Sequence, residues 1–212
     1  MSINKNTLIG AGVVIVFIMI AVIIFKSGLT EKRVVVNAPV LTDARDGKTY
    51  RTVIIANKRW MAENLNYAAD YSFCYDNDDE ICDKYGRLYD WNAAMDACPA
   101  GWVLPGRDDW NALFWAADGA NFLAGRKLKS RKGWDNKGNG RDNFGFSALP
   151  GGYSWVHNAF AGIGTSGGWW SSAHSGALNM NAWGWNMYSD RTSLSENLYN
   201  NNRGLSVRCV EE

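Results

Sequence analysis

Four cysteines limit how this chain of 212 residues can fold. They are Cys74, Cys82, Cys98 and Cys209, and no two have the Cys-x-x-Cys spacing typical of zinc and thioredoxin sites. Four cysteines allow three pairings. Sequence proximity favours a bridge between Cys74 and Cys82, which leaves Cys98 to pair with Cys209. In the chain-entropy model the long bridge is worth about 4–5 kcal/mol. Four free thiols are the alternative.

Paired cysteines require an oxidising compartment, so this interpretation implies export. Residues 8–25 form an uncharged apolar run that would be about 27 Å long as a helix, close to the bilayer core of about 30 Å. A cleaved signal peptide is the alternative, but no small-residue cleavage site follows the run. We expect a single-pass cell-membrane protein whose C-terminal domain is extracytoplasmic, in the periplasm or at the cell surface. Its parts would be an N-terminal tail (1–7), a transmembrane signal anchor (8–25), a tether (26–40) and the domain (41–212).

The composition excludes two broad classes of protein. The chain is 47% hydrophobic and 20% charged, which is typical of a folded protein and not of a disordered one. Its net charge of +1 provides no basic surface, so nucleic acid is not an expected partner. The 11 tryptophans exceed what one core of this size needs, and we expect some of these rings at a surface.

Local patterns predict strands at both ends of the domain. Residues 47–55 are rich in β-branched side chains, and the turn residues Asn57 and Lys58 lead to a return strand at 59–61. Near the C-terminus, the alternation over 205–210 predicts a closing strand. That strand would bury Leu205, Val207 and Cys209 on one face.

Between these strands the patterns predict two helices and a long irregular region. Residues 88–97 and 108–117 have helical composition, and the second stretch begins with acidic residues. Residues 119–202 contain no helical pattern longer than two turns. We therefore expect an α+β fold with two helices, short antiparallel strands and long ordered loops, in which the disulfides hold the loops in place.

Six strings of the chain are familiar together: Trp60–Tyr67, Tyr85–Trp91, Cys98–Pro105, Gly145–Gly152, Trp169–Ser172 and Ser206–Val210. They resemble those of the Fibrobacter succinogenes major paralogous domain family, over about residues 40–212. The resemblance implies a C-type lectin-like fold related to the formylglycine-generating (sulfatase-modifying) group. In that fold a disulfide joins the first helix to the final strand, in agreement with the pairing of Cys98 and Cys209. The resemblance implies a cell-surface or secreted domain and no established activity.

The best-supported hypothesis is a non-catalytic binding module for carbohydrate or another surface ligand, acting in adhesion or recognition. Sugars present C–H faces that pack on aromatic rings and hydroxyls that pair with amides and carboxylates. Residues 169–202 are rich in such side chains, and the expected ligand-binding residues are Asn181, Trp183, Trp185, Asn186, Tyr188, Asp190 and Tyr199. Six tryptophans are assigned to the scaffold: Trp60, Trp91, Trp102, Trp110, Trp169 and Trp170. Trp115, Trp134 and Trp155 are left undecided.

Two other functions are kept as alternatives. The first is a ligand-binding receptor whose loops over 178–202 are diversified, because this segment is rich in Asn, Ser and Tyr. The second is an oxidase of the formylglycine-generating type, which needs two reactive cysteines to hold copper. The four cysteines have structural uses instead, and His157 and His174 are in no recognised catalytic motif.

No cofactor or metal is expected, although calcium is an alternative. Two acidic loops, at 76–80 and 135–142, contain oxygen ligands. Neither matches the EF-hand pattern, since Lys137 occupies a ligand position in the second loop and no closing Glu follows. Such turns are more often solvated loops. The sequence does not indicate the number of subunits.

Overall fold

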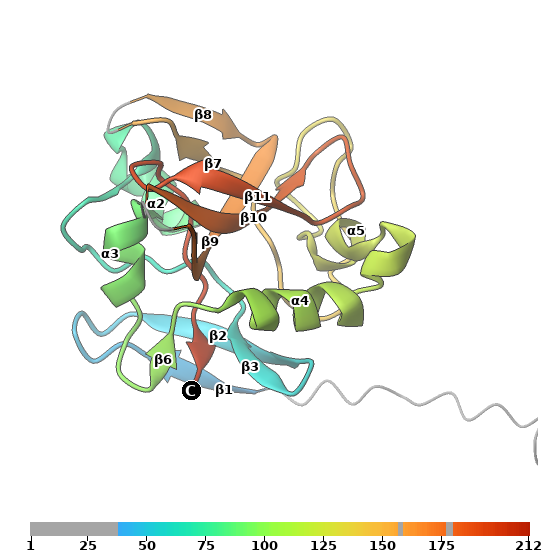
Figure 1. Ribbon diagram of the computed structural model, residues 1–212, viewed down its shortest axis with the longest axis horizontal. Coiled ribbons are helices and arrows are strands. Elements are labelled where there is room, and N and C mark those ends of the chain that lie inside the picture. Colours follow the sequence, from blue (N-terminus) through green and yellow to red (C-terminus); the bar gives the residue numbers. More distant parts are fainter. Residues whose placement is uncertain (1–37, 157–158, 177–179) are drawn as a thin grey trace, which may run out of the picture. The chain divides into compact units, whose positions relative to one another are not determined.

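Two five-stranded β-sheets build the domain (Figure 1). The structure, a computed structural model, describes residues 38–156, 159–176 and 180–212. In spatial order, the first sheet contains β1 (Ala38–Thr42), β2 (Thr49–Ile55), β3 (Lys58–Met61), β12 (Val210–Glu211) and β6 (Trp102–Val103). The second contains β11 (Ser195–Asn200), β10 (Asn181–Tyr188), β9 (Ser166–Ser175), β7 (Gly151–Ser154) and β8 (Phe160–Ile163). A small ribbon pairs β4 (Ser72–Phe73) with β5 (Leu88–Tyr89).

The helices are short. They are α2 (Asp79–Tyr85), α3 (Trp91–Asp96), α4 (Arg107–Ala116) and α5 (Ala124–Leu128), with 3-10 turns η2 (Tyr75–Asn77) and η3 (Gly119–Asn121). Acidic side chains cap two of them: Asp78 accepts a hydrogen bond from the backbone N–H of Glu80, and Asp90 from that of Ala93. At α4, the Asp109 carboxylate accepts from the N–H of Gly106. Local capping chemistry thus determines where these helices begin.

The prediction of an α+β, C-type lectin-like domain with two helices and long ordered loops is wrong. The described part of the chain is mostly β, and it contains four α-helices instead of two. The largest error concerns the region expected to contain short strands joined by long loops, where Ser166–Ser175, Asn181–Tyr188 and Ser195–Asn200 form the strands β9, β10 and β11. This segment is rich in Gly, Asn and Ser, which are not typical strand residues. It is held in the sheet by pairing with neighbouring strands and by burial of most of β9 and β10.

The predicted hairpin is confirmed, since β2 pairs with β3 through a turn at Ala56 and Asn57, which have positive φ. The helix predicted over 108–117 is confirmed as α4. The helix predicted over 88–97 is shorter than expected, because Leu88 and Tyr89 pair with β4 before α3 begins.

Tryptophan rings form the centre of the larger core. Trp110 of α4 lies between the sheets, with its ring 5.0 Å from that of Trp60 on β3 and 6.4 Å from that of Trp169 on β9. All three are fully buried. A second cluster, around Tyr89 and Trp170, packs against α3. Rings of this size bury enough apolar area to join two sheets and a helix into one core.

The C-terminal segment crosses between the sheets before it joins the first one. Leu205 exchanges backbone hydrogen bonds with Tyr89, while Ser206 accepts from Trp170 of β9 and Cys209 from Met61 of β3. The predicted closing strand is therefore reduced to Val210–Glu211, with both faces of 205–210 buried. Arg208 is fully buried, contrary to the expected alternation. It donates to Asn64 and to the backbone carbonyls of Met61, Phe146 and Ser147.

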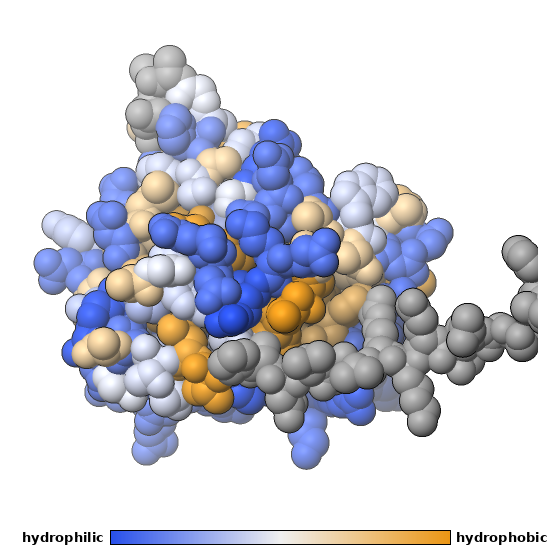
Figure 2. Space-filling model, turned by 90° about the horizontal axis from the view of Figure 1, so that it is seen from below, coloured by the Kyte–Doolittle hydropathy of each residue, from blue (hydrophilic) through white to orange (hydrophobic). Residues whose placement is uncertain are grey.

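The predictions for the N-terminal region, including the anchor over 8–25, fall outside the described residues. Within the described ranges no helix is long and apolar enough to cross a membrane. β1 begins at Ala38, so the first sheet starts inside the segment predicted as a tether. On the side of the molecule that Figure 2 shows, hydrophobic surface occurs as small patches among hydrophilic side chains.

Candidate functional site

The residues expected to bind ligand lie mainly on β10, and this strand divides them between two faces. Successive side chains of a strand point to opposite sides of the sheet. Trp183 and Trp185 therefore share one face of the strand, where both contact residues of α4, and Asn186 and Tyr188 share the other.

 Asn186 and Tyr188 lie on the face of β10 turned away from α4. The Asn186 amide donates a hydrogen bond to the Tyr188 hydroxyl, which keeps these two side chains together.

Trp185 is part of the core. It is only 4% exposed, and its ring stacks on that of Trp110 with 6.1 Å between the centroids. Phe114 of α4 also contacts it, at 5.8 Å between centroids. In this position the ring of Trp185 is not available to a ligand and belongs to the scaffold.

Trp183 is half-buried beneath a charged side chain. The guanidinium of Arg107, at the start of α4, lies over the ring at 4.2 Å from its centre. Glu196 on β11 holds Arg107 in place through two hydrogen bonds of 2.6 Å. The ring expected to form an open platform is therefore covered on one side by an ion pair.

On the opposite face of the second sheet, aromatic side chains surround a cavity of about 270 Å³, which we call the aromatic cleft. Tyr153 and Trp155 come from β7 and the residue after it, Tyr188 from β10 and Tyr199 from β11; Arg203 follows β11. The remaining lining residues are Ser166, Gly168, Asn186, Asn197, Leu198 and Leu205. Trp155 is 57% exposed, so one large ring of the cleft is open to solvent.

Arg203 occupies the centre of this aromatic group. Its guanidinium carbon lies 3.9 Å from the centre of the Trp155 ring, 4.2 Å from that of Tyr153 and 4.9 Å from that of Tyr199. Within the described part of the chain its Nε is buried and has no hydrogen-bond partner. Of the described residues that line the cleft, none is Asp or Glu. Arg203 therefore contributes a positive charge that aromatic rings hold without neutralising it.

Polar groups complete the cleft. The Asn197 amide donates to the Asn186 side-chain oxygen at 2.6 Å, so the two amides are held in fixed orientations. Burial raises the pKa of Tyr199 well above its usual range, and the neighbouring Tyr188 contributes to the shift. The Tyr199 hydroxyl stays protonated at physiological pH and remains a hydrogen-bond donor. Together these residues offer rings, amides and hydroxyls to a small polar ligand.

A second hollow of about 300 Å³ adjoins the aromatic cleft and shares Tyr153, Ser166 and Tyr188 with it. Asp190 lies here with its side chain 71% exposed, 3.9 Å from the Arg191 guanidinium. The Lys129 ammonium donates hydrogen bonds to the backbone carbonyls of Tyr188 and Arg191 and so fixes this turn.

The structure thus brings together four of the seven expected ligand-binding residues. Asn186, Tyr188 and Tyr199 line the aromatic cleft, and Asp190 lines the adjoining hollow. Trp183 and Trp185 face the other way. Asn181 is exposed at the start of β10, opposite Asn200, and lines neither cavity.

The cleft residues that were not expected include Tyr153, Trp155 and Arg203. Trp155 was left undecided, and its only sequence signal was a tryptophan outside the family strings. Tyr153 and Trp155 lie far from β10 in the sequence and reach it because β7 pairs with β9, which pairs with β10. The segment considered as variable loops forms β10 and β11 where it is described, with several side chains buried.

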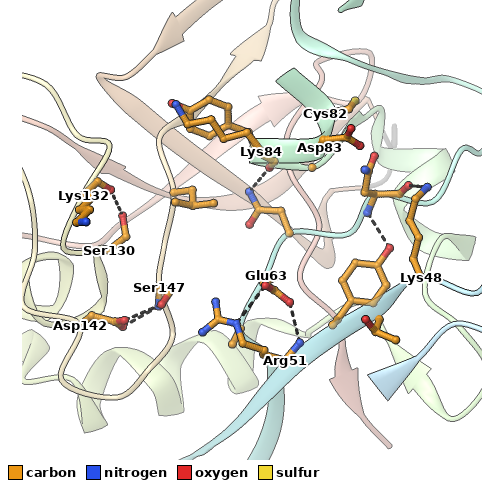
Figure 3. A pocket seen from close by; sticks show the side chains of 18 of the residues that line it. Lys48, Arg51, Glu63, Cys82, Asp83, Lys84, Ser130, Lys132, Asp142 and Ser147 are labelled. Carbon is orange, nitrogen blue, oxygen red and sulfur yellow. Dashed lines mark hydrogen bonds and ion pairs between the residues drawn. The ribbon is translucent and has the colours of Figure 1, made fainter. Parts of the chain in front are cut away.

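A larger cavity lies elsewhere, between β2, α2 and the loops around 131 and 147 (Figure 3). It has a volume of about 810 Å³ and is lined by charged side chains of both signs. Several are already engaged, since Arg51 pairs with Glu63 and Asp142 accepts hydrogen bonds from Ser147. The cavity has no tryptophan in its lining, so it does not combine an exposed ring with amides as the aromatic cleft does.

Both predicted disulfides are confirmed. Cys74 pairs with Cys82 and Cys98 pairs with Cys209, which leaves no cysteine thiol free. Cys98 follows α3, and Cys209 directly precedes β12. His174 is exposed beside Trp91, whereas His157 lies outside the described residues. Within the described ranges, no three His, Cys, Asp or Glu side chains form a group that could hold a metal ion.

One comparison with known proteins identifies the family. A family model described as the Fibrobacter succinogenes major domain matches residues 53–211. The chain belongs to this family. No curated protein and no solved structure matches the chain.

The match to the Fibrobacter succinogenes major domain includes every strand of the second sheet and therefore the whole aromatic cleft. The description of the Fibrobacter succinogenes major domain names no activity, ligand or partner. An argument about function therefore has to start from the chemistry of the cleft.

Proposed function

We propose that this protein is a non-catalytic, extracytoplasmic binding module that binds carbohydrate in the aromatic cleft. The observation that carries the proposal is the exposed ring of Trp155, placed beside Tyr153 and close to the paired amides of Asn186 and Asn197. A sugar ring offers a C–H face to the indole and hydroxyls to the amides. No other described cavity combines an exposed tryptophan with amides in this way.

The volume of the aromatic cleft agrees with a binding role. A volume of about 270 Å³ is at the small end of ligand cavities, which suits one sugar unit or the end of a glycan chain. The adjoining hollow beyond Tyr188 would receive a neighbouring unit.

The disulfides support the location and the lack of catalysis. Stable disulfides are typical of exported proteins, so they favour an extracytoplasmic domain. They also occupy all four cysteines, whereas an oxidase of the formylglycine-generating type needs a reactive pair of thiols. These observations favour binding over that chemistry.

The test is polysaccharide binding by the full-length, disulfide-bonded protein, measured by affinity electrophoresis against a panel of neutral and acidic polysaccharides. Trp155→Ala should weaken binding at least tenfold, which corresponds to about 1.4 kcal/mol. Trp155→Phe keeps a ring face and should retain part of the affinity.

Trp115→Ala is the matched control, because Trp115 is 63% exposed and lies on α4, outside the cleft. This variant should bind like the wild type. Binding that is unaffected by Trp155→Ala, or lost equally in both variants, would contradict the proposal.

A further inference from the structure

We infer that the aromatic cleft selects acidic sugars and that Arg203 binds their carboxylate. The inference rests on the proposed function and names the ligand class of the same site. It starts from the unusual environment of Arg203, which is surrounded by rings rather than by acids.

Other arginines of the domain pair with a carboxylate, whereas no carboxylate of the described chain lines the cleft around Arg203. Arg45 pairs with Asp43, Arg59 with Glu211 and Arg107 with Glu196. The aromatic rings around Arg203 attract its charge but accept no conventional hydrogen bonds from its N–H groups. The buried Nε has no partner among the described residues, and a buried donor without a partner is energetically unfavourable.

Two acids on or beside the strands of the second sheet are positioned for other contacts. Glu196 on β11 is bound to Arg107 on the opposite face of the sheet. Asp190 lines the adjoining hollow and lies beside Arg191. Neither lines the aromatic cleft. A ligand carboxylate would therefore meet a positively charged group without a competing acid in the lining.

The geometry suits a sugar acid better than a simple anion. The guanidinium of Arg203 lies over one face of the Trp155 ring, 3.9 Å from its centre, and Trp155 is still 57% exposed. A sugar that packs beside the indole on the Arg203 side of the cleft would bring its carboxylate to the guanidinium, whereas a sugar on the opposite face of the ring would be separated from it. A guanidinium binds a carboxylate through two parallel hydrogen bonds, which fixes orientation as well as charge. Neither group alone would select a uronic acid, whereas together they recognise a ring and a carboxylate at once.

The experiment uses the full-length protein and four uronic acid polysaccharides: galacturonan, alginate, glucuronoxylan and hyaluronan. Each is paired with its own carboxyl-reduced form, which keeps the sugar ring and removes the charge. We expect at least one of the four to bind and its reduced form to bind at least tenfold more weakly. Binding of the acidic form should also weaken as salt is raised from 50 to 500 mM, because added ions screen the pair.

Variants assign the effect to Arg203. Arg203→Gln should lower affinity for the acidic form at least tenfold more than it lowers affinity for the reduced form. Arg203→Lys keeps the charge without the two-pronged geometry and should give an intermediate affinity. Arg131→Gln removes one positive charge from the wall of the separate cavity of about 810 Å³ and should leave affinity unchanged. If Arg203→Gln does not fold, the comparison of each polysaccharide with its reduced form in the wild type still decides.

The outcomes separate the inference from the proposed function. Equal binding of acidic and reduced forms, with loss in Trp155→Ala, would overturn the role of Arg203 and leave carbohydrate binding in place. Binding confined to neutral polysaccharides would do the same. No binding to any acidic, reduced or neutral polysaccharide would overturn both.

Discussion

The guanidinium carbon of Arg107 lies 4.2 Å from the centre of the Trp183 ring, and Glu196 holds it there. Trp183 and the aromatic cleft lie on opposite faces of β10, and the contact with Arg107 covers the ring on the α4 side. We expect Trp183→Ala to change polysaccharide binding less than twofold in affinity electrophoresis, while Trp155→Ala weakens it at least tenfold. A large loss of binding in Trp183→Ala, with an unchanged melting temperature, would instead locate ligand on the α4 side of the sheet.

Arg208 stabilises the junction between the two sheets. It is fully buried and bonds to Asn64 and to three backbone carbonyls. Arg208→Met leaves these acceptors without donors, so we expect the free energy of unfolding to fall by about 3 kcal/mol in urea titrations. Arg208→Lys should recover less than half of this loss, since one ammonium cannot reach acceptors spread around a planar guanidinium. The exposed Arg131→Met should change stability by less than about 0.5 kcal/mol. Similar stabilities for Arg208→Met and Arg131→Met would disprove the role of Arg208.

The two disulfides should differ in their contribution to stability. Cys98 and Cys209 are 111 positions apart, whereas Cys74 and Cys82 are 8 apart. Loop-closure entropy predicts a loss of about 4–5 kcal/mol for Cys98→Ala/Cys209→Ala and about 2–3 kcal/mol for Cys74→Ala/Cys82→Ala. Urea unfolding of the two double variants measures this difference. A larger loss for the local bridge would show that chain entropy does not govern these bonds.

Lys129 should make stability depend on pH. Burial lowers the pKa of its ammonium from 10.5 to about 8. Between these values the unfolded chain binds the proton and the folded chain does not, so the free energy of unfolding rises as pH increases through this window. We expect this rise between pH 7.5 and 9.5 in the wild type and in the control Lys84→Met, whose position is exposed.

In Lys129→Met the pH-dependent rise should be absent. Urea titrations at four pH values in this interval measure it. Curves of the same slope for the wild type and Lys129→Met would show that Lys129 keeps its ordinary pKa. The upper limit of pH 9.5 avoids interference from Tyr50, whose pKa burial raises to about 12, because that group lowers stability only above pH 10.

Local features of the sequence predicted part of this fold. The β2–β3 hairpin and α4 depend on neighbouring residues, namely a turn at Ala56–Asn57 and acidic residues in the first turn of the helix. The second sheet depends on pairing between distant strands. Its central strand β9 is buried on both faces over most of its length, so it lacks the alternation that identifies a half-buried strand.

The candidate site was predicted only in part, because its residues also come from strands that are distant in the sequence. Asn186, Tyr188 and Tyr199 belong to the segment that was expected to bind ligand. Without knowledge that 181–188 is a strand, however, no pattern indicated that Trp185 would point into the core while Asn186 points away. The contribution of Trp155 depends on the order of strands in the sheet, which a single sequence does not show.

The position of β12 inside the first sheet, between β3 and β6, affects the order in which the chain can fold. A ribosome makes Val210 and Glu211 after the other strands of both sheets, so the first sheet stays open until these residues emerge. During that time Cys98 has only Cys74 and Cys82 as possible partners within the described chain. Early closure of the local bridge between Cys74 and Cys82 would keep Cys98 free until Cys209 emerges, whereas pairing of Cys98 with Cys74 or Cys82 would require a later exchange of disulfides.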